Sequence, residues 1–224
     1  MNKLSTQTLT ILKNFSGINK NLLARSGNSL STVSEAKNIL GFATIDETIE
    51  QDFGIYDLNE FLSAYALLDD PTLTFDASSV VLESGKSQVR YRFADESILT
   101  FPTKKINMPK ADLKVEISAE ALNQIRKAAS ALGHTVASIK KVDDSISLSV
   151  VDPKNATANT YSIVLQEDAE TNAEFDLQFL ISSLKVIPGD YTVEISSKLI
   201  SHWAHVTEPV EYYIALEKSS SYEA

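Results

Sequence analysis

Two copies of one pattern occupy the sequence, each consisting of a helix, several strands, a second helix and further strands. The first helix of each copy is predicted over 5–15 and 118–132, where apolar residues recur at helical spacing behind a serine, a favoured N-cap residue. The second helices are predicted over 56–63 and 175–182, which share an aromatic-Asp-Leu opening. A repeat at this distance predicts two similar domains in one chain.

Alternation of apolar and polar residues fills much of the sequence between these helices. It is strict over 145–150 and recurs over 88–93 and 191–195, which is the period of a strand with one exposed face. The run 140–146 predicts a hairpin that turns at its Asp-Asp pair. Together with the helices, these strands indicate an α+β fold with antiparallel sheets.

A connector separates the two copies. Residues 99–110 contain two prolines and three lysines, which suits an extended segment. We therefore predict an N-terminal domain over 1–98, a connector over 99–112 and a C-terminal domain over 113–224.

Composition removes several classes of function. A chain without cysteine forms no disulfide, thiolate nucleophile or cysteine-ligated metal site, and it fits a reducing compartment. None of the seven glycines falls in a dinucleotide-binding or P-loop pattern. No stretch resembles a signal peptide or approaches the length of a membrane span. We expect a cytoplasmic protein, in the host cytoplasm if the chain is viral, with no membrane partner and no cofactor.

The formal charge of −10 argues against a simple electrostatic binder of nucleic acid. The charge is unevenly distributed, because residues 1–34 contain no Asp or Glu but include Lys3, Lys13, Lys20 and Arg25. From the residues alone, a solvated helix face with a chance bias in charge is the favoured interpretation.

Candidate catalytic groups are few. His202 and His205 have a spacing that recurs in metal sites, but on a strand their side chains would point to opposite faces, and no third ligand is evident. The Asp-Asp pairs at 69–70 and 143–144 lie at expected turns. No catalytic residue or metal site is predicted, and a metal-dependent hydrolase that uses the two histidines is the weakest of the alternatives.

Several segments are similar to a known family. The internal repeat, the first helix ending in Leu9–Phe15, the string Ile55–Leu62 and the terminal run Tyr213–Glu217 together resemble the sliding clamps of T4-type bacteriophages. The layout is more distantly similar to proliferating cell nuclear antigen. The resemblance follows the order of motifs over nearly the full chain.

This resemblance implies a homotrimeric ring of two-domain subunits, with two helices per domain lining a central pore and antiparallel sheets outside. Duplex DNA would pass through the pore without sequence-specific contacts, and the ring would tether the replicative DNA polymerase and confer processivity. An ATP-dependent clamp loader would place the ring on DNA, and the clamp itself would catalyse nothing. The alternative is a structural or assembly protein of duplicated domains without a DNA function.

The resemblance also implies roles for individual residues. Basic side chains in a pore would attract phosphates without reading bases. The residues that we expect to face DNA are Lys13, Asn14, Lys20, Asn123, Arg126, Lys127 and Lys185. Edge strands over 89–93 and 161–166 would pair between subunits to close the ring.

A hydrophobic pocket for partner peptides is implied beside the connector. Exposed apolar groups in a proline-containing connector need something to cover them, and a peptide could do so. The residues expected in this pocket are Phe93, Leu99, Phe101, Ile106, Met108, Tyr213, Ala215 and Leu216.

Overall fold

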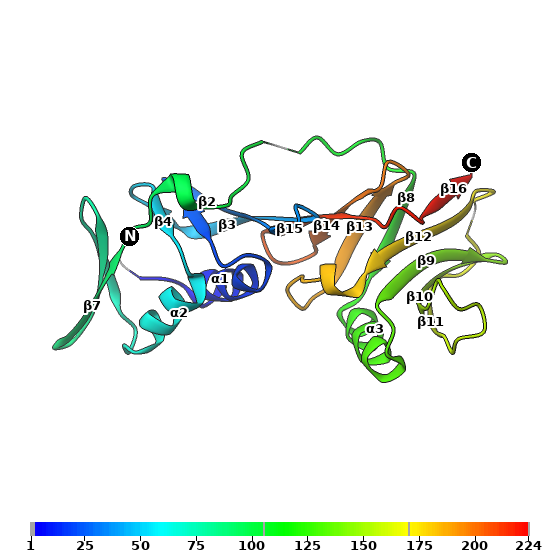
Figure 1. Ribbon diagram of the computed structural model, residues 1–224, viewed down its shortest axis with the longest axis horizontal. Coiled ribbons are helices and arrows are strands. Elements are labelled where there is room, and N and C mark those ends of the chain that lie inside the picture. Colours follow the sequence, from blue (N-terminus) through cyan, green and yellow to red (C-terminus); the bar gives the residue numbers. More distant parts are fainter. Residues whose placement is uncertain (1–2, 105, 170, 224) are drawn as a thin grey trace. The chain divides into compact units, whose positions relative to one another are not determined.

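A computed structural model describes residues 3–104, 106–169 and 171–223. The chain divides into two compact units (Figure 1). The first unit holds Met1–Lys105 with Pro209–Glu211, and the second holds Ile106–Glu208 with Tyr212–Ala224. The division falls within the segment predicted to be the connector. Each unit combines antiparallel strands with helix, which confirms the α+β class.

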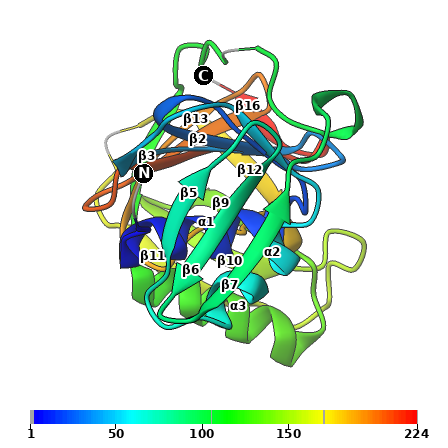
Figure 2. The same ribbon diagram turned by 90° about the vertical axis from the view of Figure 1, so that its left-hand side faces the viewer.

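The first unit packs two helices against short antiparallel strands. Its elements in chain order are α1 (Thr6–Ile18), β1 (Leu22–Ala24), β2 (Gly27–Val33), β3 (Ile39–Ile49), β4 (Phe53–Ile55), α2 (Leu58–Ala66), β5 (Thr72–Phe75), β6 (Ser79–Ser84), β7 (Ser87–Arg92) and the 3-10 helix η1 (Glu96–Ile98). Strand β1 pairs with β4, β2 pairs with β3, and β5, β6 and β7 form a three-stranded sheet with β7 at its edge. Figure 2 shows this three-stranded sheet face on.

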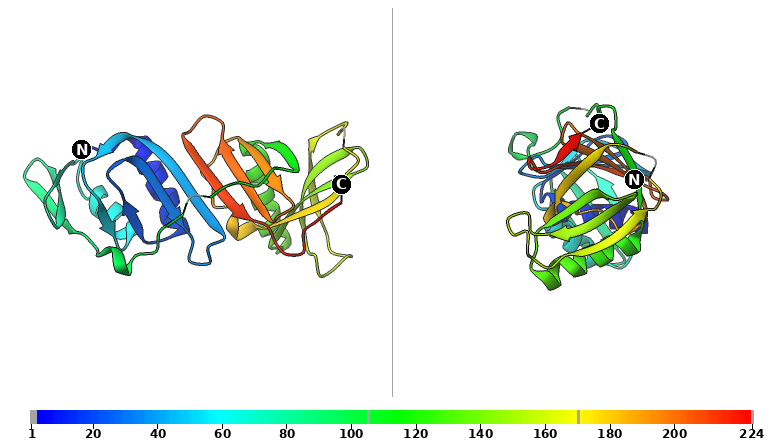
Figure 3. Two further views of the ribbon diagram at one scale, coloured as in Figure 1. Left: turned by 90° about the horizontal axis from the view of Figure 1, so that it is seen from above. Right: turned by 90° about the vertical axis from the view of Figure 1, so that its right-hand side faces the viewer.

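Both helices of the first unit begin where the sequence supplies a cap. The Ser5 hydroxyl accepts the backbone N–H of Thr8 at 3.1 Å, and α1 buries Ile11, Leu12 and Phe15 against β2 and β3 (Figure 3, left). Helix α2 begins two residues later than predicted, because the Asp57 carboxylate caps it. Both predicted helices are confirmed.

Glu47 on β3 ties that strand to the start of α1. Its carboxylate accepts the Thr8 hydroxyl at 2.6 Å and also the backbone N–H of Ser5. Burial alone would raise the pKa of Glu47, but these hydrogen bonds outweigh it, and the net pKa lies below the usual range. The ionised carboxylate therefore stabilises the fold above the unfolded-state pKa, and this contribution is lost as the pH falls through the folded value.

We expect Glu47→Gln to lower the free energy of unfolding by about 1 to 2 kcal/mol at pH 7. The neutral amide of glutamine has one acceptor oxygen in place of the two charged carboxylate oxygens that accept from Ser5 and Thr8. At acidic pH, below the folded-state pKa of Glu47, the difference between the two proteins should shrink. Urea unfolding at both pH values measures this. An equal difference at pH 7 and at acidic pH would contradict the role of the ionised group.

The second unit contains one α-helix among its described residues. Its elements are β8 (Leu113–Ile117), α3 (Ala119–Leu132), β9 (Val136–Val142), β10 (Ser145–Val151), β11 (Tyr161–Gln166), β12 (Glu174–Leu180), the 3-10 helix η2 (Ile181–Ser183), β13 (Tyr191–Ser196), β14 (Ile200–His205), β15 (Val210–Ala215) and β16 (Ser221–Glu223). The first two residues of β15 are counted with the first unit. One sheet has the order β11-β10-β9-β12-β16, so β11 lies at an edge, and β15, β14, β13 and β8 are neighbours in another.

Helix α3 begins and ends as its sequence indicates. The Ser118 hydroxyl accepts the N–H of Ala121 at 3.1 Å, and Gly133 ends the helix with a φ of 70°, a conformation that glycine adopts without strain. The helix packs against β9 and β10 (Figure 3, right). The hairpin predicted at 140–146 is also confirmed, with Asp143 in the left-handed region at its turn.

The prediction of a helix over 175–182 is wrong. Residues Glu174–Leu180 form strand β12, which pairs with β9, and only the short η2 follows. The buried apolar residues Phe175, Leu177 and Phe179 follow a two-residue period that a strand satisfies and a helix does not, and the polar Gln178 between them is also buried. The second unit therefore lacks the second α-helix that was expected of it. None of the helices in the part of the chain that the structure describes is long and apolar enough to cross a membrane.

Candidate nucleic-acid interface and partner site

Helix α1 carries an exposed polar face. Lys13 is exposed, and Asn14 beside it is half-buried, while the opposite face of the helix is buried in the first unit. No Asp or Glu occurs anywhere in α1. Lys13 thus adds a positive charge to this face, and no acidic residue of the same helix lies beside it.

Lys20 lies where the end of α1 meets the start of α2. Its backbone carbonyl accepts the N–H of Leu58 at 2.7 Å, which fixes the segment after α1 to the first turn of α2. Its ammonium lies 5.3 Å from the centre of the Tyr56 ring, and that ring is 50% exposed. A cation over an exposed ring keeps most of its hydration, so the charge remains available to an anion.

Three of the predicted residues lie on α3, in two different environments. Asn123 and Lys127 are exposed. Arg126 is partly buried, and its guanidinium donates to the carbonyl oxygens of Leu184 at 2.6 Å and Val186 at 3.4 Å. Burial lowers the pKa of Arg126, although a guanidinium remains charged at any ordinary pH. Arg126 therefore fastens the segment after η2 to α3.

Lys185 is exposed between the two residues whose carbonyls Arg126 holds. It belongs to no α-helix, in contrast to its expected place near the end of one. The Arg126 contacts nevertheless keep it beside α3, so a basic residue is present where the missing helix was expected to supply one.

The candidate partner residues of the first unit lie in three settings. Phe93 packs with Phe53 and Phe75 at ring-centre distances of 5.6 and 6.4 Å, so it is part of an aromatic cluster. Leu99 covers the backbone at Gly54, where a Cβ would lie 2.7 Å from the Leu99 side chain. Phe101 is half-buried under the Arg25 guanidinium, 5.5 Å from the ring centre.

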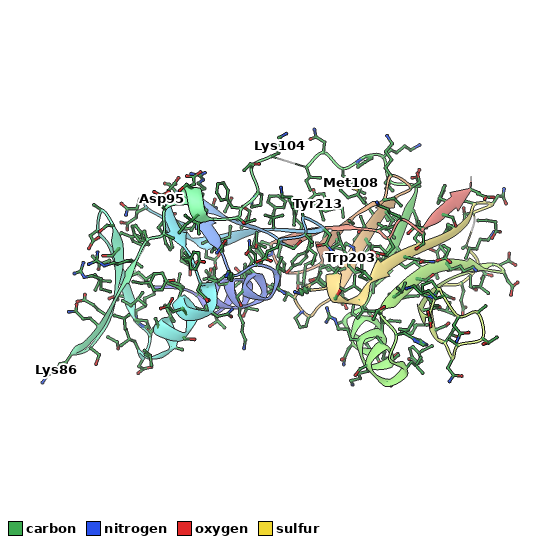
Figure 4. All side chains as sticks on the ribbon, viewed as in Figure 1. Lys86, Asp95, Lys104, Met108, Trp203 and Tyr213 are labelled. Carbon is green, nitrogen blue, oxygen red and sulfur yellow. The ribbon has the colours of Figure 1, made fainter. Side chains whose placement is uncertain are left out.

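The other candidates belong to the second unit. Ile106 and Met108 are half-buried on the connector, and Figure 4 shows Met108 there and Tyr213 on β15. Tyr213 stacks on His202 with ring centres 4.7 Å apart. Ala215 is half-buried, whereas Leu216 is only 6% exposed and belongs to the core.

The two histidines of β14 do not converge. His202 contacts Tyr213, while His205 packs on Tyr191 at 4.9 Å. The Nδ1 of His205 accepts the backbone N–H groups of Thr207 and Glu208 at 3.2 and 3.0 Å. This nitrogen is committed to the turn after β14, which removes the geometry that a metal-dependent hydrolase would need.

Comparisons with known proteins identify the family. The model of the DNA polymerase processivity factor matches residues 3–101, and that of the C-terminal part of the gp45 sliding clamp matches residues 114–218. The sliding clamp of Vibrio phage KVP40 is 30% identical over 96% of this chain and 99% of its own length. The chain belongs to the sliding-clamp family.

Two further comparisons extend this result. The sliding clamp of Escherichia phage RB69 is 30% identical over 99% of both chains. A structure of proliferating cell nuclear antigen from A. fulgidus, with the C-terminal region of FEN-1 bound, has a TM-score of 0.71 at 14% identity and covers 99% of this chain and 100% of that one. The sliding-clamp fold therefore extends over both units of the chain.

Sequence reasoning missed one group of residues in this sliding clamp. Asn19 and Asn21 flank Lys20, and both are buried, with 4% and 7% of their surface exposed. Their side chains bind the backbone of Thr100, about 80 residues later in the chain. The sequence offers only a weak signal of this, namely two asparagines just after a helix, where exposed turn residues are the usual expectation.

Proposed function

We propose that three copies of this chain close into a ring around duplex DNA and tether the replicative DNA polymerase, with no catalytic step of their own. The full-length similarity to phage sliding clamps carries this proposal. The exposed polar faces of α1 and α3 support it, because they carry basic side chains in an otherwise acidic chain. An ATP-dependent loader would open the ring, since the family's topology requires DNA to enter it.

The DNA-facing residues of this proposal differ in how they would act. Lys13 and Lys127 are exposed on helices and would contact phosphates directly, with Lys20 and Lys185 at the adjoining segments. Arg126 would add charge while its donors remain on backbone carbonyls. The short amides Asn14 and Asn123 would leave room for water. Such contacts are weak and interchangeable, which suits a ring that slides.

Partner peptides would bind the half-buried apolar residues of the connector and of β15. In the A. fulgidus structure, the C-terminal region of FEN-1 is bound to the clamp. By analogy, the C-terminal segment of the polymerase would be the first partner of this chain. Among the predicted pocket residues, Phe101, Met108 and Tyr213 have the exposure that a peptide contact needs, whereas Leu216 would support them from the core.

Ring closure would use the two edge strands. Strand β7 is an edge of the first unit and β11 is an edge of the second, and each offers unpaired backbone groups along one side. Val164 on β11 is 52% exposed, so about half of this apolar residue on that edge meets solvent in a single chain. Pairing of β11 with β7 of the next copy would cover it.

Light scattering tests the ring directly. We expect a mass about three times the 24.6 kDa of one chain at micromolar concentration. Val164→Glu should reduce the mass to that of one chain, because a carboxylate would be placed in the contact between copies. Val206→Glu is the matched control, since Val206 is 62% exposed in the same unit but follows β14.

A wild-type mass of one chain would contradict the ring. If the Val164→Glu protein remains a trimer, β11 is not part of the contact between copies.

A further inference from the structure

Asn19 and Asn21 form a hydrogen-bonded pair inside the first unit. The Asn19 amide nitrogen donates to the carbonyls of Val33 and Thr100, both at 2.9 Å, and its oxygen accepts the N–H of Asn21 at 2.9 Å. The Asn21 amide nitrogen donates to the Tyr56 carbonyl at 2.7 Å, and its oxygen accepts the N–H of Thr100 at 3.1 Å. The oxygen and the nitrogen of each amide are thus both engaged.

The pair holds both backbone groups of Thr100, one with each amide. A neighbouring strand holds an extended chain in the same way, by taking the N–H and the C=O of one residue on one side. The backbone before Thr100 is extended, with φ of −100° and ψ of 147° at Leu99. The two side chains therefore make the hydrogen bonds that a neighbouring strand would make, at the point where the connector leaves the first unit.

The residues on either side of Thr100 are fixed as well. Leu99 lies against Gly54, and Phe101 lies under Arg25. The Arg25 guanidinium is held in turn by Glu96 at 2.8 Å and by Asp52 at 2.7 Å. These contacts are exposed or apolar, whereas the amide pair is buried and its hydrogen bonds to Thr100 are directional.

Burial of two asparagines is costly unless their hydrogen bonds form, so a packed apolar pair could stabilise this site as well. Unlike an apolar pair, the amides form directional hydrogen bonds that orient the connector backbone. They set the position of the connector backbone relative to the ends of α1 and α2, and hence the direction in which Phe101 projects.

We propose that Asn19 and Asn21 are positioning residues for partner binding: they hold the start of the connector in the geometry that the C-terminal peptide of the polymerase needs. This inference rests on the proposed partner site. The two asparagines do not touch the peptide, and act on it through Thr100.

Two variants remove the hydrogen bond between the Thr100 N–H and Asn21 from opposite ends, and Asn21→Ala also removes the donor to the Tyr56 carbonyl. Asn21→Ala removes the acceptor, and Thr100→Pro removes the donor, with Leu99 already in the extended conformation that precedes proline. We expect each variant to weaken binding of a fluorescent polymerase C-terminal peptide about tenfold, as measured by anisotropy, and the double variant to be within about twofold of either single one.

Hydrogen exchange gives a readout that is independent of the peptide. In Asn21→Ala, exchange over 99–101 should be faster by roughly tenfold or more, while the β5–β6–β7 sheet remains as protected as in the wild type. Ile45→Val is the control for general loss of stability, because Ile45 is buried in the same unit and its apolar side chain makes none of these hydrogen bonds. It should lower the melting temperature without changing peptide affinity.

The outcomes separate the two proposals. A wild-type protein that does not bind the peptide contradicts the proposed partner site, and the positioning role with it. If the wild type binds, and Asn21→Ala binds equally well although exchange over 99–101 has increased, the positioning role alone is wrong. Additive losses in the double variant would also overturn it, because the two residues would then act separately.

Discussion

Gly54→Ala is expected to destabilise the first unit by about 3 kcal/mol or more, the largest effect of any single methyl group that we predict. A Cβ at this position would lie 2.4 Å from the carbonyl oxygen of Ala94 and 2.7 Å from the Leu99 side chain. The Ala94 carbonyl is backbone and cannot rotate away, and the N–H of the same residue donates to the Gly54 carbonyl at 2.9 Å. Relief therefore requires the segment before the connector to separate from β4.

Gly17→Ala is the matched control. Gly17 lies in α1, and a Cβ there meets nothing within 4 Å. The same chemical change should leave stability unchanged or raise it by up to about 1 kcal/mol, because alanine favours helix more than glycine does. Urea unfolding followed by circular dichroism compares the two variants. Wild-type stability for Gly54→Ala would mean that the chain around Ala94 does not pack on β4.

Gly54→Ala also tests the partner site. If the segment from Ala94 to Leu99 moves away from β4, the Thr100 backbone loses its place between Asn19 and Asn21. Peptide affinity should then fall together with stability in Gly54→Ala, whereas Asn21→Ala should lose affinity with a smaller loss of stability. Comparing Gly54→Ala with Asn21→Ala thus separates the effect of overall stability on peptide affinity from the effect of the position of the Thr100 backbone.

The parts of the fold that local sequence determines were predicted. Helices α1 and α3 have a serine cap and an apolar stripe, and the hairpin at Asp143 has its turn residues, so each signal lies within the element itself. The helix prediction for the segment from Phe175 to Ser182 was wrong because it relied on an aromatic-Asp-Leu opening that matches that of α2. The buried apolar side chains of this segment alternate instead, and pairing with β9, which is distant in sequence, decided between strand and helix.

The candidate site divides in the same way. Lys13 and Lys127 could be identified from helical periodicity, because exposure on an amphipathic helix is a local property. The burial of Arg126 was not visible, since its acceptors at Leu184 and Val186 come from a segment about 60 residues away. Asn19, Asn21 and Gly54 were missed for the same reason, because their partners are brought to them only by the folded chain.

Reversing the charge of Lys13 and Lys127 together is expected to reduce loading of the ring onto DNA by at least about tenfold at moderate salt, because each phosphate contact adds steeply to association. The chain carries a net charge of −10, so most of its surface repels DNA, and screened attraction extends only about 10 Å. The few exposed lysines of the helices would therefore have to guide DNA into an open ring. Loader-driven capture of nicked circular DNA measures this step.

Lys86→Glu is the control for a charge reversal outside the helices; it changes the net charge by −2 per chain, against −4 for the double variant. Lys86 lies at the tip of the β6–β7 hairpin, well away from α1 (Figure 4). It should load like the wild type, and both variants should bind the polymerase peptide normally. Once loaded, the Lys13→Glu, Lys127→Glu ring should stay on closed circles, because encirclement rather than affinity would retain it. Loading of this double variant at the wild-type rate would remove these lysines from the DNA interface, and rapid loss of it from closed circles would mean that charge rather than topology holds the clamp on DNA.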